Sequence, residues 1–199
     1  MSDFREKFLS KPRRKFRSLM GLKSKMVGIG RGDMLFLEYV IANMPELSVI
    51  VELGTFGGVT SMFLGMIARL RGVPFCTFDI KDLRVQEVKE AWLNDMMYFY
   101  QTDILSEPSS YVTELVKNPN TFLFVDNGDK EKEANMYASY CGPNAVMVIH
   151  DWGDEVKQEN VEPELHKCGF KMEYETVATE LRSVCRCYIN GNATYEGAK

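Results

Sequence analysis

The sequence predicts an α/β protein with one doubly wound, seven-stranded and mostly parallel sheet whose last strand is antiparallel. Apolar runs of strand length alternate five times with segments of helical periodicity, as in chains built from β-α units. The run over 121–125, TFLFV, is wholly apolar, which is typical of a parallel strand covered on both faces. Two further strand-like segments, over 170–176 and 183–189, close the chain with a turn between them.

The first helix is expected over 34–44, where apolar residues recur at helical spacing until Pro45 stops the pattern. Strands and helices then alternate. The first half continues with a strand over 48–53, a helix over 59–70, a strand over 74–79, a helix over 85–93 and a strand over 97–101. The second half has a helix over 109–117, the strand over 121–125, a helix over 132–140, a strand over 145–151 and a helix over 155–167.

Length and charge limit the possible classes of protein. A chain of 199 residues with 45% hydrophobic content is long enough for one well-buried domain, expected over 34–199. The net charge of -4 makes nucleic acid an unlikely partner, although nine basic residues crowd the first 25 positions. Residues 1–33 are interpreted as a basic arm followed by a glycine-rich lid, and the alternative for the glycine-rich part is an ordinary linker. The arm is either a solvated or frayed segment or a contact for phosphate or an acidic partner.

Cysteine usage and hydropathy indicate the cytoplasm. The five cysteines form no C-x-x-C pair, which fits reduced thiols better than a disulfide framework or a structural zinc site. The sequence contains neither an apolar run of membrane-spanning length nor a signal-peptide core, and acidic residues at positions 3 and 6 weaken a mitochondrial presequence. We expect a small-molecule substrate, no membrane partner and a possible homo-oligomer.

The most informative segment is VIVELGTFGGVTS over 49–61, which predicts a strand, a tight glycine turn and a helix start. Glycines there let backbone approach a ligand closely. The carboxylate of Glu52 argues against a phosphate at this point and suits a ligand with an ammonium group and hydroxyls, such as S-adenosylmethionine. A dinucleotide is the alternative, but its G-x-G-x-x-G fingerprint has glycine where this chain has Glu52.

Acidic residues recur at the ends of the predicted parallel strands. Because ligands of doubly wound sheets bind beyond the carboxyl ends of the strands, these acids are expected to line one ligand-binding edge. They are Glu52, Asp79, Asp103, Asp126 and Asp151.

These features resemble the class I S-adenosylmethionine-dependent methyltransferases over roughly 34–155. Within them the chain is most similar to the small-molecule O-methyltransferases, which include the catechol, macrocin and rhamnosyl enzymes and the cephalosporin-hydroxylase-like group. The strings VELGTFGGVTS and VIHDWGDE carry the resemblance. A Rossmann-like methyltransferase fold is the architecture that it implies.

The resemblance also implies roles in cofactor binding. Glu52 and the glycine turn would hold the methionine part, and Asp79 would accept hydrogen bonds from both ribose hydroxyls. Asp103 would accept from the adenine amine while Ile104 packs on the ring. The residues implied in cofactor binding are Glu52, Gly54, Thr55, Phe56, Gly57, Asp79, Ile80, Asp103, Ile104 and Asp126.

In the metal-dependent relatives, acids at the ends of the fourth and fifth strands bind a divalent cation that activates the acceptor hydroxyl. By that resemblance Asp126 and Asp151 are candidate ligands, and their hard oxygens favour Mg²⁺ over zinc. His150 is either a further ligand, a base or a hydrogen-bonded packing residue.

Lys130 is near the position of the lysine base of the catechol group. Partial burial beside a cation would lower its pKa enough for it to accept a proton. The alternative is a solvated lysine, and Asp129 and Glu131 compete for the metal. The chain also departs from the hydroxylase-like group, because 126–131 reads DNGDKE and lacks the histidine that this group often has.

The predicted function is methyl transfer from S-adenosylmethionine to a small hydroxylated substrate, a sugar or a phenol, assisted by a metal. One alternative is a metal-independent methyltransferase that acts on nitrogen or on a macromolecule through the basic arm. The other is a non-catalytic scaffold of the same fold.

Overall fold

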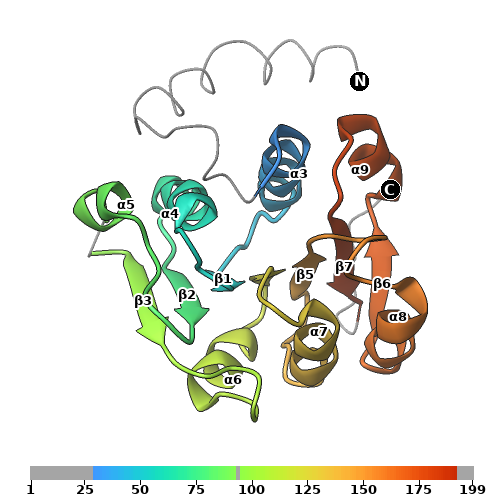
Figure 1. Cartoon of the computed structure of the whole chain (residues 1–199). Coiled ribbons are helices and arrows are strands. Elements are labelled where there is room, and N and C mark those ends of the chain that lie inside the picture. Colours follow the sequence, from blue (N-terminus) through green and yellow to red (C-terminus); the bar gives the residue numbers. More distant parts are fainter. Residues whose placement is uncertain (1–28, 93–94, 192–199) are drawn as a thin grey trace.

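The computed structural model describes residues 29–92 and 95–191, which form a sheet between two layers of helices (Figure 1). The strand order is β3-β2-β1-β4-β5-β7-β6. Neighbouring strands among β1 to β5 are parallel, whereas β7 is antiparallel to both β5 and β6. The predicted fold class is therefore confirmed. The strands are β1 Val49–Leu53, β2 Phe75–Asp79, β3 Met97–Gln101, β4 Thr121–Val125, β5 Val146–Ile149, β6 Phe170–Glu173 and β7 Arg186–Asn190.

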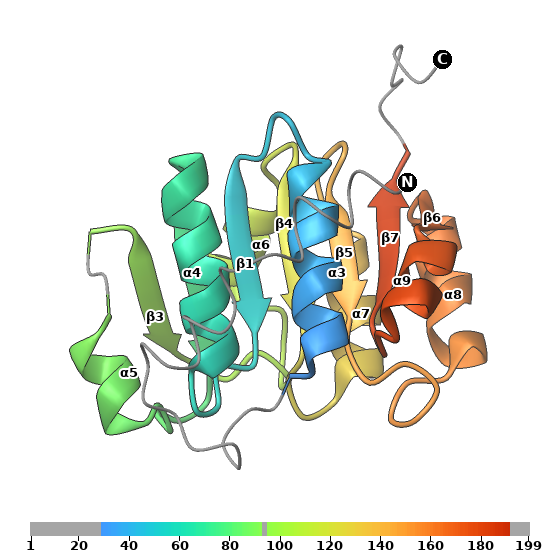
Figure 2. The same cartoon turned by 90° about the horizontal axis from the view of Figure 1, so that it is seen from above.

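The helices are divided between the two faces of the sheet. Figure 2 shows α3, α4 and α9 side by side on one face, and Figure 1 shows α6, α7 and α8 on the other. None of the described helices is long and apolar enough to cross a bilayer. The helices are α3 Arg31–Ala42, α4 Val59–Arg71, α5 Gln86–Glu90, α6 Ser110–Val116, α7 Lys130–Ala138, α8 Gln158–Lys167 and α9 Glu175–Leu181.

The central strands are apolar because each of their faces is buried against a different helical layer. In β1, Ile50 belongs to the core under α3 and α4, whereas Val51 belongs to the core against α6 and α7. Every residue of β1, β2, β4 and β5 is buried. Both cores are thus built mainly from the apolar residues of these strands, which also bury the polar side chains of Glu52, Thr77 and Asp79.

Several boundaries differ from the prediction by up to about three residues, and two differences concern the packing of α3 and α9. The turn expected between the last two strands contains a helix, α9, whose short and mostly polar sequence ETVATEL gives little periodic signal. Helix α3 begins at Arg31, so residues 31–33 form its first turn instead of the end of a lid. The predicted basic arm and the remainder of the lid lie outside the described residues.

Helix α3 can contain Gly32 because its backbone packs directly against the end of α9. A Cβ atom at position 32 would lie 2.4 Å from the carbonyl oxygen of Leu181 and 2.7 Å from that of Arg182. Real Cβ atoms do not approach backbone this closely, so any larger residue would push the two helices apart.

Replacing Gly32 with alanine is therefore expected to destabilise the fold, although alanine is the better helix former. We expect the Gly32→Ala variant to lose about 1–3 kcal/mol of unfolding free energy in urea denaturation, the usual cost of overpacking. Gly128→Ala is the control, since a Cβ there meets nothing within 4 Å. Equal stabilities of the two variants would contradict the close packing of α3 against α9.

Candidate functional site

The site lies where the strand order reverses, at the carboxyl ends of β1 and β4. From β1 the chain builds outward to β3 and then returns to place β4 on the other side of β1. Ligands of doubly wound sheets bind at such a switch point. The loops after β1 and β4 are in contact there, since a Cβ on Gly54 would lie 2.3 Å from the carbonyl oxygen of Asp126.

The glycine turn after β1 is held by Asp79 at the end of β2. Oδ2 of Asp79 accepts the backbone N–H groups of Thr55 at 3.1 Å and Phe56 at 2.9 Å. Gly54 has φ of 97° and Phe56 has φ of 43°, so the turn includes a non-glycine residue in the left-handed region. The Phe56 side chain is 67% exposed at this edge. Thr55 and Gly57 complete the turn, as predicted.

Asp79 is where the prediction places it, but its carboxylate is already engaged. It is buried, and its Oδ1 accepts the N–H of Lys81 at 3.2 Å while Oδ2 holds the turn. Ile80, which follows it, is 55% exposed. Both ribose hydroxyls could bind Asp79 only if they shared oxygens that already accept backbone protons.

Glu52 is not at the ligand edge. It is fully buried beneath α4, and its Oε2 accepts hydrogen bonds from Ser61 and from Thr77, the latter at 2.6 Å. Burial raises the pKa of Glu52 to about 8. The carboxyl therefore joins β1, β2 and α4 under the turn, and in this structure it is not accessible to hold a methionine group as the resemblance implies.

The predicted adenine contacts are split between surface and core. Asp103 is exposed after β3, and its Oδ1 accepts the N–H groups of Leu105 and Ser106. Ile104 is only 2% exposed and packs in the core, where its carbonyl oxygen accepts the Tyr137 hydroxyl at 2.9 Å. The apolar side chains exposed near the turn are those of Phe56 and Ile80, not that of Ile104.

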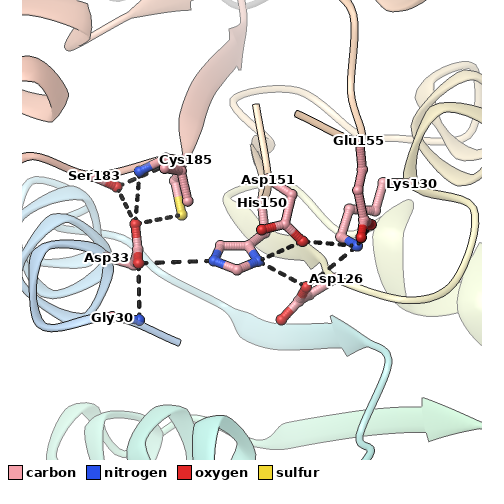
Figure 3. Close-up of polar contacts among 10 residues, drawn as sticks. Gly30, Asp33, Asp126, Lys130, His150, Asp151, Glu155, Ser183 and Cys185 are labelled. Carbon is pink, nitrogen blue, oxygen red and sulfur yellow. Dashed lines mark hydrogen bonds and ion pairs between the residues drawn. The ribbon is translucent and has the colours of Figure 1, made fainter. Parts of the chain in front are cut away.

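A cluster of charged side chains lies beside the glycine turn, at the ends of β4 and β5 (Figure 3). His150 Nδ1 is 3.0 Å from Asp126 Oδ1 and 3.2 Å from Asp151 Oδ2. Lys130 Nζ, from the first turn of α7, is 3.0 Å from Asp151 Oδ2 and 3.8 Å from Asp126 Oδ1. It also donates to Glu155 Oε2 at 2.6 Å. The structure thus brings together all the residues predicted to bind metal or to act in catalysis.

Both basic groups of the cluster are held in their charged forms. Burial lowers the pKa of His150, but the carboxylates of Asp126, Asp33 and Asp151 outweigh burial and raise it to about 10. Burial also lowers the pKa of Lys130, but the hydrogen bonds that Glu155 and Asp151 accept from it outweigh burial and raise the pKa. Neither group is a base at neutral pH in this arrangement.

Asp33 is the member of the cluster that sequence reasoning missed. Its Oδ2 is 3.8 Å from His150 Nε2, on the side of the ring opposite Asp126. The only local signal at Asp33 is its place three residues after Gly30, at the start of α3, where an acid caps a helix. Nothing in that pattern connects it with β5.

The donor set fits a divalent cation. Oxygens of Asp126 and Asp151 and a nitrogen of His150 lie within 4.8 Å of one another, and both carboxylates are partly exposed. Among the described residues, four carboxylates, counting Asp33 and Glu155, meet two cationic side chains, which gives this part of the chain an excess of negative charge. Carboxylate oxygens suit Mg²⁺. Lys130 competes for the same oxygens, so a bound cation would have to displace its ammonium group.

Comparison with models of protein families and with curated protein sequences finds no match. Several solved structures are similar. A Staphylococcus aureus protein assigned as a caffeoyl-CoA O-methyltransferase is 14% identical, with a TM-score of 0.60 over 95% of this chain and 96% of that one. A Thermotoga maritima S-adenosylmethionine-dependent O-methyltransferase is 13% identical, with a TM-score of 0.58 over 91% and 72%.

The CurJ carbon methyltransferase is 16% identical, with a TM-score of 0.58 over 81% of this chain, which spans 54% of the CurJ structure. The chain has the Rossmann-like methyltransferase fold. At these identities the likeness establishes the fold and leaves the reaction to be argued from the site.

The burial of Glu52 predicts a specific pH dependence of stability. Its folded pKa of about 8 lies above the ordinary value of 4.5, so the folded protein binds one more proton between these values than the unfolded chain. The stabilisation is complete below pH 4.5 and is lost as the pH rises through 8. This loss amounts to up to about 1.4 kcal/mol per pH unit.

Glu52→Gln, which imitates the protonated side chain, should flatten the fall in unfolding free energy between pH 5 and 8. Urea denaturation at several pH values measures the unfolding free energy and therefore its slope with pH. Glu133, also buried with a pKa raised to about 8, leaves a residual slope in this variant. The exposed Glu87→Gln is the control and should keep the original slope. An unchanged slope in Glu52→Gln would show that Glu52 is ionised in the fold.

Proposed function

We propose that this chain is an S-adenosylmethionine-dependent methyltransferase that acts on a small hydroxylated substrate, a sugar or a phenol, with Mg²⁺ bound by Asp126 and Asp151. The observation that carries the proposal is the contact between the glycine turn and the acidic cluster. The backbone of Gly54 in the turn packs directly against the backbone carbonyl of Asp126 in the cluster. A cofactor on the turn and an acceptor at the acids would be neighbours. The methyltransferase fold of the chain agrees with this arrangement.

In the proposed reaction the acceptor oxygen attacks the methyl carbon in line with the carbon–sulfur bond. That bond breaks, its electron pair stays on sulfur, and S-adenosylhomocysteine leaves while the hydroxyl proton passes to a base. A cation at Asp126 and Asp151 would lower the pKa of the hydroxyl and orient it. The protein supplies the proximity of the two reactants, which is a large part of the rate enhancement in such transfers.

The role of Lys130 depends on what neutralises the acids around it. While Asp151 and Glu155 accept its protons, it remains an ammonium group. Positive charge bound at Asp126 and Asp151 would remove part of that attraction and repel the ammonium, and its pKa would fall. Lys130 is therefore proposed as the proton acceptor only in the loaded site. His150, between Asp126 and Asp33, is better placed to orient groups than to accept a proton.

The position of Lys130 favours a second candidate, a methyltransferase of the same fold that uses no metal. Its ammonium already lies among Asp126, Asp151 and Glu155. An excess of carboxylates would equally attract an amine acceptor, so nitrogen would be the methylated atom.

Cofactor binding is tested first at Asp79. Asp79→Asn removes the negative charge that orders the turn, and we expect the affinity for S-adenosylhomocysteine to fall roughly 10- to 100-fold, the cost of losing hydrogen bonds to a charged group. Isothermal titration calorimetry measures it. Asp95→Asn, at an exposed acid just before the start of β3, is the control. No binding by the unaltered protein would refute the proposed activity.

The metal is tested by Lys130→Met. If Mg²⁺ competes with the Lys130 ammonium for Asp126 and Asp151, removing that charge should tighten Mg²⁺ binding by roughly tenfold or more. Methyl transfer should decrease at the same time, because the proposed base is gone. Calorimetry with MgCl₂ measures the binding, and Lys132→Met, at an exposed lysine of the same helix, is the control. If neither the unaltered protein nor Lys130→Met binds Mg²⁺, the metal-independent candidate is favoured.

A further inference from the structure

We propose that Asp33 is a positioning residue, which holds the His150 imidazole with Nδ1 facing Asp126 and Asp151. The inference rests on the proposed function, because it assigns the orientation of a side chain in that site. It concerns a residue of α3, outside both loops that form the acidic cluster. Figure 3 shows Asp33 on one side of the ring and the acid pair on the other.

The Asp33 carboxylate is itself fixed in place. It is buried, and its Oδ2 accepts the N–H of Gly30 at 2.9 Å. Its Oδ1 accepts the Ser183 hydroxyl at 2.7 Å and the N–H of Val184 at 2.8 Å. The Cys185 thiol lies 3.7 Å from the same oxygen. Donors from the start of α3 and from the segment before β7 thus leave the carboxylate little freedom to move.

His150 lies between this fixed carboxylate and the acid pair. Its Nε2 is buried, is 3.8 Å from Asp33 Oδ2, and has no hydrogen-bond partner among the residues that the structure describes. Its Nδ1 faces Asp126 at 3.0 Å and Asp151 at 3.2 Å. The ring of Phe124 packs at a centroid distance of 6.1 Å. The Cys185 sulfur also lies within 4.8 Å of a ring nitrogen, but Asp33 is the charged group that faces Nε2 among the described residues and can fix it.

When Nε2 of His150 is fixed by Asp33, the direction in which Nδ1 points is fixed as well. A histidine beside a metal or a substrate is oriented by the group that its other nitrogen contacts, and carboxylates commonly provide that contact. With Asp33 in place, the ring keeps the orientation that presents Nδ1 to Asp126 and Asp151. Without its charge, the ring can turn over or tilt, and the two acids lose a common partner.

A purely structural role for Asp33 makes a different prediction. Its bonds to Gly30, Ser183 and Val184 join α3 to the segment before β7, so losing them lowers stability whatever happens to His150. Asp33→Asn keeps an acceptor oxygen for Ser183 and Val184, gives up the hydrogen bond from Gly30, and removes the charge that faces His150. Ser183→Ala does the reverse, because it weakens the junction and keeps the charge. The pair of variants separates the two roles.

The first readout is the affinity for Mn²⁺, measured by calorimetry on the full chain as a probe of the Mg²⁺ site. We expect Asp33→Asn to weaken binding roughly 10- to 100-fold, the usual effect of changing an outer-shell partner of a metal site. Ser183→Ala should change the affinity less than about twofold. Equal losses in both variants would overturn the inference, since a loosened junction would then explain them.

The second readout follows the ring itself and requires neither metal nor activity. The chain has two histidines, so His166→Gln, at an exposed position of α8, leaves His150 as the single imidazole in ¹⁵N NMR spectra. In this background an Nε2 proton protected from solvent, with a nuclear Overhauser contact to the Asp33 side chain, is expected. Asp33→Asn should shift the ring nitrogen signals, and Ser183→Ala should leave them nearly unchanged.

The outcomes distinguish this inference from the proposed function. Ring signals that do not respond to Asp33→Asn, or no contact between the His150 ring and Asp33 in the His166→Gln protein, would overturn the positioning role even if the protein binds Mn²⁺. Ring signals that respond in a protein that binds no Mn²⁺ would support the positioning role and overturn the metal part of the proposed function.

Discussion

The His150 imidazole connects the parts of this structure that matter for function. It is held between the acids that end β4 and β5 on one side and the Asp33 carboxylate of α3 on the other. Charges buried at this depth are costly unless they are paired, so the positions of these side chains depend on one another. The ring therefore joins one helical layer to the carboxyl edge of the sheet. The rigidity of the site depends on the contacts of His150 with Asp33, Asp126 and Asp151.

Much of the fold could be predicted from the sequence because the sheet is parallel and covered on both faces. Such strands are short, continuous apolar runs, and each of the seven predicted strands is present close to its predicted bounds. Helix α9 was missed, since seven residues with one buried side chain carry almost no periodicity. Its neighbour α3 starts at Arg31, three residues before the predicted start, because packing accommodates Gly32 in the helix although glycine is a poor helix former.

The site was predicted less completely, for geometric reasons. Position in the sequence placed Asp79, Asp126, Lys130, His150 and Asp151 correctly at one edge. It did not show that Glu52 points beneath α4, although Val51 and Leu53 on either side of it face the opposite core. Ile104 is similar, since only the loop conformation turns it into the core. Asp33 required a contact between distant segments, which no single-sequence pattern contains.

The position of β7 has a consequence for how this protein is made. Because β7 lies between β5 and β6, the strand that precedes it in the chain has no partner in the sheet until Arg186–Asn190 is in place. Residues 183 and 184, which hold Asp33, also precede β7 directly. A nascent chain leaving the ribosome would thus display an unpaired edge at β5 until β7 had emerged. Completion of the sheet and closure of the site around His150 are then one and the same folding event.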